Sequence, residues 1–555
     1  MFNLILPEII IAVAAILILL TGFKFKKFSG YIALLGIVVS LISLLAIVFQ
    51  PSTADSTTKI AIAEGIGLFY NVGLLAVVFK FIFLIVGLMT VIASLKYTEK
   101  FISDKIFDAY YALVLFAILG MMVVASATDL LTLFVGLEMA AIPAYVLVAA
   151  EKTKKGIEGA AKYFLFGTVF STILLFGISL IYFSTGSLML DQIGILCMGE
   201  DENLKLLTFI GILAVILGLA YEMSAAPFHF WAPDAYQGAS SPVSALLAGA
   251  SKKMAFVALL KILVVFTLLF KFELSVMLAI LAILSMLVGN VLALAQKDVR
   301  KMLAYSSIAQ VGYILAAIAI FTPLGIAYAV YYIIVHAFMK GGAFIAAGAL
   351  LFVSDGKIKN YDDYKGLWRT APVTAIAMAA FMLSLAGIVP FGGFTAKILV
   401  LVELFVQAMQ ENMLALILGV VMIITSVISL YYYGRLIKYM WFVEPEGMEH
   451  GNEGHSEHNE HNEHREHNEH KEHSEHNEHS EHNEHSEHNE HNEHKEHSEH
   501  NEHKEHSEAK FKKFKEPLAF IIPMAIAVVA LIILFYAPPF VEICTNIVES
   551  LGVQL

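Results

Sequence analysis

Residues 221–234 read YEMSAAPFHFWAPD, and residues 385–397 read LAGIVPFGGFTAK. Each stretch lies inside a long apolar run and carries a helix-breaking proline, Pro227 in the first and Pro390 in the second. Non-helical backbone is tolerated at membrane depth only where it is buried in protein or lines a wet cavity. Each break also lies close to an ionisable residue, Glu222 or Lys397. This combination favours a transporter-like membrane protein over two long helices that proline merely kinks.

Apolar runs long enough to cross a bilayer extend outward from these two stretches over most of the 555 residues. The composition is 58% apolar and 15% charged, with a mean hydropathy of +0.73, which excludes an ordinary soluble domain. A spanning helix needs roughly 20 mostly apolar residues. The fourteen runs are 3–22, 30–50, 68–94, 109–127, 130–149, 161–183, 206–231, 242–269, 274–296, 301–321, 324–352, 371–405, 412–442 and 517–540. The sequence therefore predicts an all-α polytopic membrane protein with 14 transmembrane helices.

The order of the runs predicts two inverted five-helix repeats, each containing a broken helix. Runs four to eight and nine to thirteen would form two units of odd helix number, with opposite topology and the break in the fourth helix of each. The predicted segments are an N-terminal three-helix segment (1–108), a first repeat (109–270), a second repeat (271–443), a disordered His/Glu-rich cytoplasmic loop (444–516) and a C-terminal transmembrane helix (517–555).

Lys and Arg predict the orientation of these helices. Outside the His/Glu-rich loop, sixteen of them lie in loops after odd-numbered runs and three lie in loops after even-numbered runs. Positive charge marks the cytoplasmic side of a membrane protein. We therefore expect both termini outside and the His/Glu-rich loop in the cytoplasm.

Ionisable side chains inside apolar runs are the candidate functional residues, because burying a charge in a membrane is costly. They are Glu138, Lys162, Glu222, Lys252, Lys253, Lys261, His336, Lys340, Lys397 and Glu403. Such a set predicts a polar axis that conducts protons, although inward-facing structural ion pairs are the alternative. Lys162 and Lys261 lie near the ends of their runs, where a lysine can reach the interface.

The expected proton relay consists of Glu138, Glu222, Lys252, His336 and Lys397. Lys162, Lys253, Lys340 and Glu403 are expected to support it, with Glu403 near the exit. A carboxylate that moves or takes up a proton can switch a nearby lysine between holding and releasing its own. The unperturbed pKa of histidine, about 6.5, suits a relay, whereas the alternative for His336 is a buried structural histidine.

Five motifs point to a known family. They are GLEMAAIPAYVLVA (136–149), AAKYFLFGTVFSTILLFG (160–177), PFHFWAPDAYQGASSPVSALLAGASKKMAF (227–256), QKDVRKMLAYSSIAQVGYIL (296–315) and SLAGIVPFGGFTAKILVL (384–401). These strings resemble the antiporter-like membrane subunits of complex I, and among them the subunit N branch of bacterial NADH-quinone oxidoreductase. The resemblance covers about residues 1–442 and the final span.

The resemblance implies a proton path along the bilayer midplane, driven by NADH oxidation in distant subunits. NADH, flavin, iron–sulfur clusters and quinone are then expected on partner subunits, and none of them on this chain. Two cysteines, Cys197 and Cys544, are too few for a cluster, and no glycine-rich nucleotide loop is present. The expected partners are the other membrane subunits of complex I and the lipid bilayer of a bacterial inner membrane, without nucleic acid.

By position in these motifs, the resemblance assigns family ionisable residues to Glu138, Lys162, Lys252 and Lys397. The string VHAFMKGGAF, which contains His336 and Lys340, instead resembles one in the sister subunits. Glu222 departs from the family, which normally has a lysine there. If Glu138 and Glu222 approach each other, repulsion should leave one of them protonated and able to hand on a proton. The alternative is a subunit that pumps poorly or acts only as a scaffold.

A histidine-rich tract separates the last two runs. Residues 444–508 hold 22 Glu, four Lys or Arg and 19 His, so this segment has a net charge of −18 with its histidines neutral. Because the whole chain has a net charge of −12, the remaining residues carry +6. The tract cannot bury a core and should be disordered. Histidines at every third position over 450–506 suit a divalent metal such as Zn²⁺, and their protonation would also switch the charge. A tolerated repeat expansion in a surface loop is the third alternative.

Two other function classes share the broken-helix motifs. One is a subunit of a multi-subunit Mrp-type cation/proton antiporter, which would work without redox partners. The other is a subunit of a membrane-bound hydrogenase or of an F420-linked complex. Because the electron donor binds elsewhere, the subunit composition of the native complex separates these alternatives.

Overall fold

The computed structural model describes residues 2–48, 73–197, 201–444 and 513–551, which are helical apart from turns, connections and two isolated bridges. The elements are α1 (Phe2–Phe25), α2 (Ser29–Val48), α3 (Leu74–Phe101), α4 (Phe107–Ser126), α5 (Leu130–Val148), α6 (Lys154–Thr185), α7 (Leu190–Leu196), α8 (Glu202–Met223), α9 (Ala232–Gly238), α10 (Ser241–Leu246), the π-helical turn η4 (Leu247–Ser251), α11 (Lys252–Leu294), α12 (Val299–Ala319), α13 (Pro323–Val353), α14 (Leu367–Thr370), α15 (Pro372–Ala386), α16 (Gly392–Met409), α17 (Met413–Phe442), α18 (Leu518–Ile533) and α19 (Pro538–Ser550). Among these residues, twelve helices are long and apolar enough to cross a membrane, or thirteen if the bent pair α18 and α19 forms one span. The prediction of an all-α polytopic membrane protein is confirmed.

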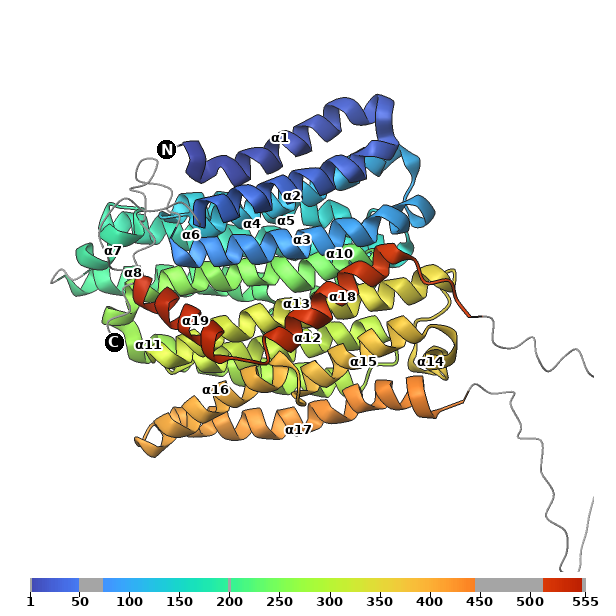
Figure 1. The fold of residues 1–555 in the computed structure, drawn as a ribbon. Coiled ribbons are helices and arrows are strands. Elements are labelled where there is room, and N and C mark those ends of the chain that lie inside the picture. The colour runs from blue at the N-terminus through green and yellow to red at the C-terminus, as the bar shows by residue number, and fades with distance from the viewer. Residues whose placement is uncertain (1, 49–72, 198–200, 445–512, 552–555) are drawn as a thin grey trace, which may run out of the picture. The chain divides into compact units, whose positions relative to one another are not determined.

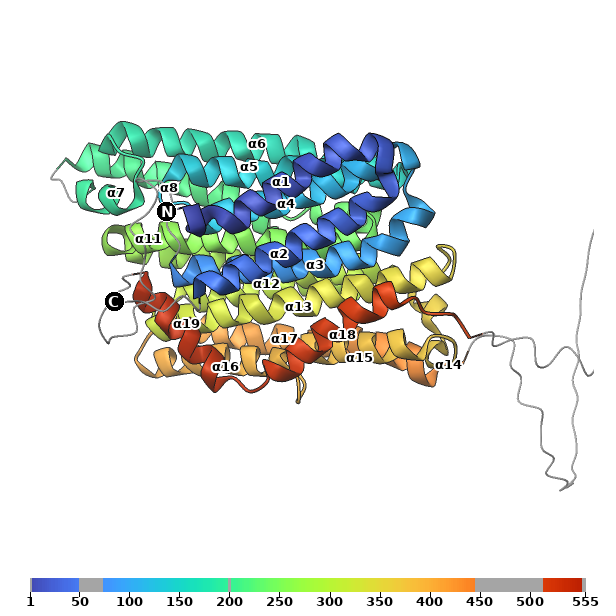
Figure 2. The same ribbon diagram turned by 45° about the horizontal axis from the view of Figure 1, so that its top comes forward.

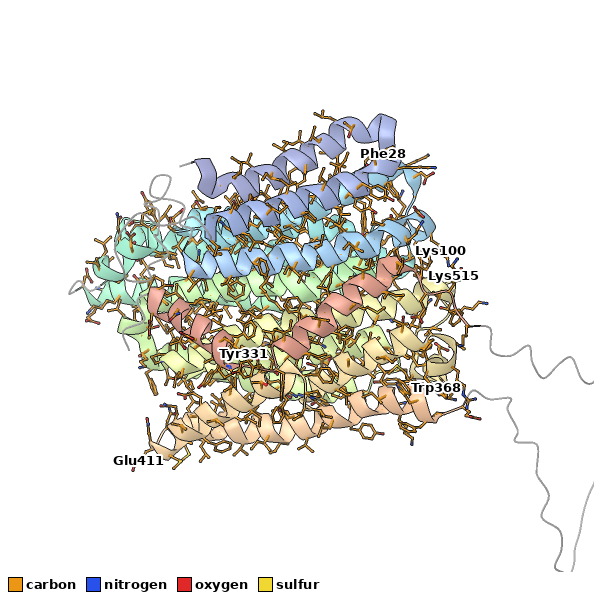
Figure 3. All side chains as sticks on the ribbon, in the orientation of Figure 1. Phe28, Lys100, Tyr331, Trp368, Glu411 and Lys515 are labelled. Carbon is orange, nitrogen blue, oxygen red and sulfur yellow. The ribbon has the colours of Figure 1, made fainter. Side chains whose placement is uncertain are left out.

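The long helices lie side by side with their axes roughly parallel (Figures 1 and 2). The apolar window of α13 is completely buried and that of α12 is 94% buried, whereas those of α2, α6 and α17 are about one-third buried or less. Charged side chains such as Lys100 and Lys515 lie at one end of the bundle, and Glu411 lies at the other (Figure 3). The outer helices therefore present apolar side chains outward, as a membrane requires, and α12 and α13 form the centre.

Both expected helix breaks are present. α8 ends at Met223, where Ser224 adopts a left-handed conformation with φ 59°, and α15 ends at Ala386, where Gly387 does the same with φ 85°. Each left-handed residue precedes its break proline by three positions, and the Ala226–Pro227 and Val389–Pro390 bonds are cis. The run 371–405 is thus divided into α15 and α16, and in the run 206–231 the helix α8 gives way to turn residues that lead to α9.

Other run boundaries also differ from the prediction. The runs 242–269 and 274–296 both fall in α11, which is interrupted between them at Phe270, where φ is −130° and ψ is 33°. The run 242–269 itself begins as α10 and the η4 turn. In the final run, α18 is followed by α19 at an angle of 87°. Apolar composition does not show where a helix bends, because a kinked helix and a straight one bury similar side chains.

Two short backbone bridges repeat within the chain. Asp129 caps the start of α5, and the backbone pairs there through Leu130 N to Leu188 O (3.0 Å) and Leu190 N to Thr128 O (3.1 Å). Asp298 caps the start of α12 in the same way, with Val299 N to Lys359 O (3.0 Å) and Tyr361 N to Lys297 O (3.2 Å). In each case the capped helix is followed by a long helix and then by a broken one.

Gly393 packs directly against the second break. A Cβ built on it would overlap the carbonyl oxygen of Ser384, a backbone atom that cannot move aside alone. We expect Gly393→Ala to lower the melting temperature of the assembled complex, at a cost of about 1–3 kcal/mol or more. Gly434→Ala is the matched control, because nothing lies within 4 Å of its added Cβ. Equal melting temperatures for the two variants would contradict this account of the break.

The described helices belong to one compact unit, residues 1–444 and 513–555. Residues 445–512, which contain the histidine-rich tract, lie outside the described residues, so its predicted disorder and metal binding stay predictions. Cys197 and Cys544 are both buried and are not joined in a disulfide.

Candidate functional site

Glu138 on α5 and Glu222 at the end of α8 line the same cavity, which has a volume of about 20 Å³. A space of this size is large enough for one water molecule. Ser171 of α6 donates a hydrogen bond to Glu138. Both acids therefore line one small cavity, and the exchange of a proton between them stays a prediction.

Glu222 faces the centre of the bundle through two hydroxyl donors. Ser251, the last residue of the η4 turn, donates to its Oε1 at 3.3 Å, and Tyr163 does so at 3.5 Å. Trp231, inside the first break, stacks on the Tyr163 ring at 3.9 Å with an angle of 3° between the planes. The break therefore holds the phenol that faces Glu222, and this role of Tyr163 had no signal in the sequence beyond its place in the KYF motif.

Lys252 and Lys253 follow the η4 turn and point to different partners. The Nζ of Lys252 lies 3.5 Å from Ser307 Oγ and 5.0 Å from the centre of the Tyr236 ring. The Nζ of Lys253 lies 2.8 Å from Nδ1 of His336 and donates to the carbonyl of Ala248 at 2.5 Å. Successive side chains on a helix point about 100° apart, so Lys252 and Lys253 contact different groups, Ser307 and His336 respectively. His336 thus contacts Lys253, which was expected only to support the relay.

Lys340 continues the row on α13, one turn after His336. Its Nζ donates to Ser306 Oγ at 2.5 Å and to Leu303 O at 2.9 Å. Both partners belong to α12, and all three residues are buried. The ammonium of Lys340 is therefore solvated by α12 rather than by a carboxylate.

Gln310 connects this region to the second break, and sequence reasoning missed it. Its amide nitrogen donates to Leu385 O at 3.4 Å, and its carbonyl accepts from Tyr332 at 2.5 Å. The same nitrogen lies 3.5 Å from the Tyr433 hydroxyl. A buried amide flanked by two phenols forms a polar link across an otherwise apolar interior.

Lys397 lies at the second break, on α16. Its Nζ donates to Ala386 O at 3.1 Å and lies 5.3 Å from the centre of the Tyr313 ring. The carbonyls of Leu385 and Ala386 end α15, where a helix leaves acceptors without backbone partners. Gln310 and Lys397 bind these two consecutive carbonyls, so the break supplies the ligands that keep a cation in the bundle.

Glu403 lies six residues beyond Lys397, on the buried side of α16. Its Oε1 accepts hydrogen bonds from Thr322 at 2.7 Å and from Gln407 at 3.1 Å. Thr322 caps the start of α13, and this end of α13 is the end of the bundle where α1 begins. Glu403 thus lies between the buried row and one end of the bundle, and its role near an exit stays a prediction.

Lys162 lies apart from the cavity of the two acids. Its Nζ contacts Asp234 at 2.6 Å and Glu158 at 2.7 Å, and Lys301 contacts Asp234 from the other side at 3.0 Å. Burial opposes ionisation of Asp234, but the hydrogen bonds from Lys162 and Lys301 outweigh it and lower the pKa of Asp234. This partly exposed cluster ties α6, α9 and α12 together just beyond the first break.

A second intramembrane acid–base pair lies outside these residues. Glu8 of α1 and Lys80 of α3 form an ion pair of 2.7 Å, and their side chains are 5% and 0% exposed. Both residues fall inside predicted apolar runs, so the rule that selected the other ten would also have found them. The sequence analysis did not include Glu8 and Lys80 among its candidate residues.

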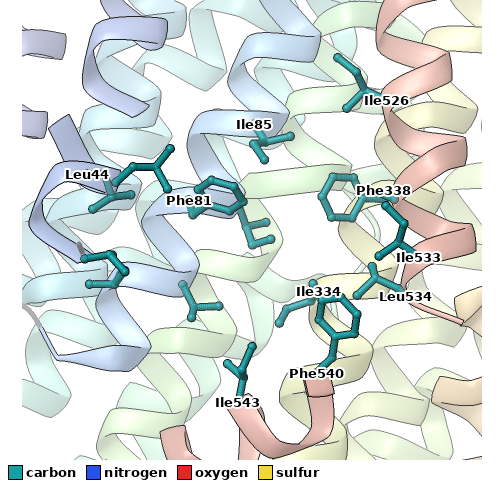
Figure 4. A pocket seen from close by; sticks show the side chains of 16 residues that line it. Leu44, Phe81, Ile85, Ile334, Phe338, Ile526, Ile533, Leu534, Phe540 and Ile543 are labelled. Carbon is teal, nitrogen blue, oxygen red and sulfur yellow. The ribbon is translucent and has the colours of Figure 1, made fainter. Parts of the chain in front are cut away.

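Other kinds of site find less support in the described residues. A cavity of about 420 Å³ between α2, α3, α13, α18 and α19 is lined by apolar side chains, among them Leu44, Phe81, Phe338 and Phe540 (Figure 4). An apolar wall offers a proton no group to bind. Within the described part of the chain, no cluster of three His, Cys, Asp or Glu residues is placed to hold a metal.

Comparison with known proteins matches residues 127–428 to a family described as NADH:quinone oxidoreductase/Mrp antiporter, transmembrane region. A protein named F(420)H(2) dehydrogenase subunit N from Methanosarcina mazei is 40% identical over 465 residues, which cover 80% of this chain and 89% of that protein. NADH-quinone oxidoreductase subunit N from Trichlorobacter lovleyi is 37% identical, covering 79% and 87%. A chain of respiratory complex I from Thermus thermophilus with bound aureothin aligns with a TM-score of 0.63 and 32% identity, covering 79% and 90%.

Proposed function

The chain belongs to the membrane-subunit family shared by NADH:quinone oxidoreductases and Mrp antiporters, and from this membership we propose that it is the proton-translocating subunit N of a respiratory quinone-reducing complex. One observation carries the proposal. Ionisable and hydroxyl side chains form a row through the bundle that begins at the half-buried Glu138 and continues through buried residues from Glu222 to Glu403. Burying such groups inside a membrane is costly, and ionisable residues kept there typically mark an ion or proton path.

The first half of the row works as a carboxyl pair that controls a lysine. Glu138 and Glu222 line one cavity, so repulsion between them disfavours the doubly ionised state and the pair keeps one proton. Moving that proton toward Glu138 leaves Glu222 negative, which favours a protonated Lys252. Returning it removes the attraction and lets Lys252 release its proton. Glu222 thus takes the place of the lysine usual in the family and passes a proton between neutral and anionic forms instead.

The second half carries the proton onward. Lys253 can exchange a proton with His336 across 2.8 Å, and Lys340 follows on the next turn of α13. Gln310, with the hydroxyl groups of Tyr332 and Tyr433, lies between this region and Lys397. Glu403 then leads to the end of the bundle. Lys162 holds the first break in place through Asp234 and is a positioning residue in this scheme.

We assign the chain 14 transmembrane helices in two inverted repeats. The proposal is supported by the two equivalent breaks and by the two backbone bridges at Asp129 and Asp298. The segment boundaries remain those predicted, 109–270 and 271–443. The Lys and Arg bias supports an orientation with both termini outside a bacterial inner membrane and the histidine-rich loop in the cytoplasm, where it can bind divalent metal.

The redox chemistry belongs to partner subunits in this proposal. NADH, flavin, iron–sulfur clusters and quinone bind there, and the partners of this chain are the other membrane subunits of the complex. A second candidate donor is reduced F420, which the 40% identity to the Methanosarcina mazei protein favours. The membrane subunit is expected to work alike with either donor, because the proton row contains no redox group.

Purification of the native complex tests the function. After reconstitution in proteoliposomes, addition of NADH or reduced F420 with a soluble quinone should acidify one side, as followed by a fluorescent amine. Redox subunits should co-purify with the chain, and the donor that supports acidification identifies the complex. Proton movement that requires a sodium gradient and no electron donor, in a preparation without redox subunits, would instead show an Mrp-type antiporter.

A further inference from the structure

The last described part of the chain, residues 513–551, lies outside residues 127–428, which match the family. Its helices α18 and α19 pack against α13 and meet at an angle of 87° (Figure 1). α13 carries His336 and Lys340 of the proton row, and the row itself contains no residue of this C-terminal segment. The contacts that the segment makes show which other parts of the row it holds.

The bend between α18 and α19 binds two helices that carry residues of the row. α18 ends just before Leu534, and the carbonyls at a helix end lack partners within the helix. Tyr331 of α13 donates a hydrogen bond to the carbonyl of Leu534. Thr395 of α16 donates to the next carbonyl, that of Phe535, at 3.1 Å. Gly392 begins α16 and packs on the bend, because a Cβ added to it would lie 3.1 Å from Cβ of Leu534.

The other end of the segment caps α15, the first half of the second broken helix. Ala371 precedes α15 and offers no side-chain acceptor to the first amides of that helix. The carboxylate of Glu516 takes this place, because it accepts from the amides of Val373 at 3.1 Å and Thr374 at 2.7 Å. An acceptor with negative charge stabilises a helix at this end. The C-terminal segment therefore holds α15 at its start and α16 at the break.

The relative placement of α15 and α16 decides how Lys397 is held. Its Nζ lies on α16 and donates at 3.1 Å to the carbonyl of Ala386, the last residue of α15. Thr395, which the bend binds, lies two residues before Lys397 on the same helix. A displacement of about 1 Å at a reacting group can lower a rate by about 10²-fold. The segment that holds both halves of the broken helix can therefore act on Lys397 through the position of its carbonyl partner.

We propose that residues 513–551 form a brace that sets the position of Lys397, holding α15 through Glu516 and α16 through Thr395. The inference rests on the proposed function. Thr395, Glu516 and Tyr331 are positioning residues, and no proton passes through them. The brace keeps the last carbonyl of α15 within reach of the Lys397 ammonium, while Tyr331 ties α13 to the same bend.

Thr395→Val in the assembled complex tests the brace, because valine has nearly the shape of threonine and lacks its hydroxyl. We expect the number of protons moved per donor oxidised, measured in proteoliposomes, to fall about tenfold with assembly and melting temperature unchanged. Thr395→Ser keeps the hydroxyl and should restore proton movement. Normal proton movement in Thr395→Val, or a loss that Thr395→Ser does not restore, overturns the inference. A melting temperature that falls together with proton movement would show a structural tie only and overturns it as well.

Glu516→Ala tests the other end of the brace. It removes the cap of α15 and should also lower the number of protons moved per donor oxidised. Added to Thr395→Val, it should cause little further loss, because both residues act on the same contact of Lys397. Losses that multiply in the double variant would show two independent effects and contradict a single brace.

Thr545→Val in α19 is the matched control, because the hydroxyl of Thr545 donates to Val541 O of its own helix, at 3.0 Å, and its removal should change nothing. A loss of proton movement in this control would mean that any lost hydroxyl in the segment has the same effect, against the specific role of Thr395. If Lys397→Ala stops proton movement while Thr395→Val does not, only this inference fails, whereas no effect of either variant removes the proposed function.

Discussion

Lys397→Ala should stop proton translocation by the assembled complex while quinone reduction by artificial donors continues. The substitution removes the ammonium between the carbonyl of Ala386 and the Tyr313 ring, and no other ionisable group replaces it at the second break. Loss of a proton-transferring group typically costs about 10²-fold or more in rate. Protons moved per donor oxidised, measured in proteoliposomes, should therefore fall to near the leak level.

Lys438→Ala is the matched control for this experiment. Lys438 is exposed on the neighbouring helix α17, so its removal should leave both proton movement and quinone reduction unchanged. Lys397→Arg should keep a positive charge but not a proton that can be released, because guanidinium does not lose its proton in proteins. It should therefore be as inactive as the alanine variant. An unchanged proton stoichiometry in Lys397→Ala removes Lys397 from the path.

Glu222→Gln should abolish proton translocation to a similar degree. Glutamine keeps the shape of the side chain and its contacts with Ser251 and Tyr163, but it cannot exchange a proton with Glu138 across their shared cavity. The loss should again be about 10²-fold, with assembly intact.

Glu222→Lys provides a sharper comparison, because lysine is the residue usual at this position in the family. A lysine there can pair with Glu138, so we expect part of the proton movement to return. Glu411→Gln, at an exposed turn, is the control and should have no effect. Normal pumping by Glu222→Gln would show that the path bypasses this residue, and the scaffold alternative would then apply to the first half of the row.

Much of the architecture follows from residue types and their spacing. Apolar runs of membrane length can only be helices, because every backbone amide must be paired within the run. Proline near Glu222, and glycine and proline near Lys397, mark the breaks, because these residues interrupt a helix locally. The helical class, the two breaks and ten of the ionisable residues were therefore predictable without any long-range contact.

Partners across the bundle were not predictable. Lys252 and Lys253 are adjacent, and the η4 turn decides which of them meets His336. Gln310 and Tyr433 contact each other across 123 positions of the chain, and no local sequence feature indicates that either residue belongs to a polar network. Glu8 and Lys80 are 72 positions apart, and only the packing of the helices shows that they form an ion pair.

There is a physical reason why some features were predictable from the sequence and others were not. Hydrophobicity, helix breaking and the cost of a buried charge act on single residues or short windows, so the sequence alone determines that this chain crosses the membrane, where its helices break and which residues carry charge inside. Proton transfer depends on separations of a few ångströms between side chains from different helices, and packing sets those separations. Only the tertiary structure decided that Glu138 and Glu222 share one cavity, that Lys253 contacts His336, and that a broken helix supplies the carbonyl that holds Lys397.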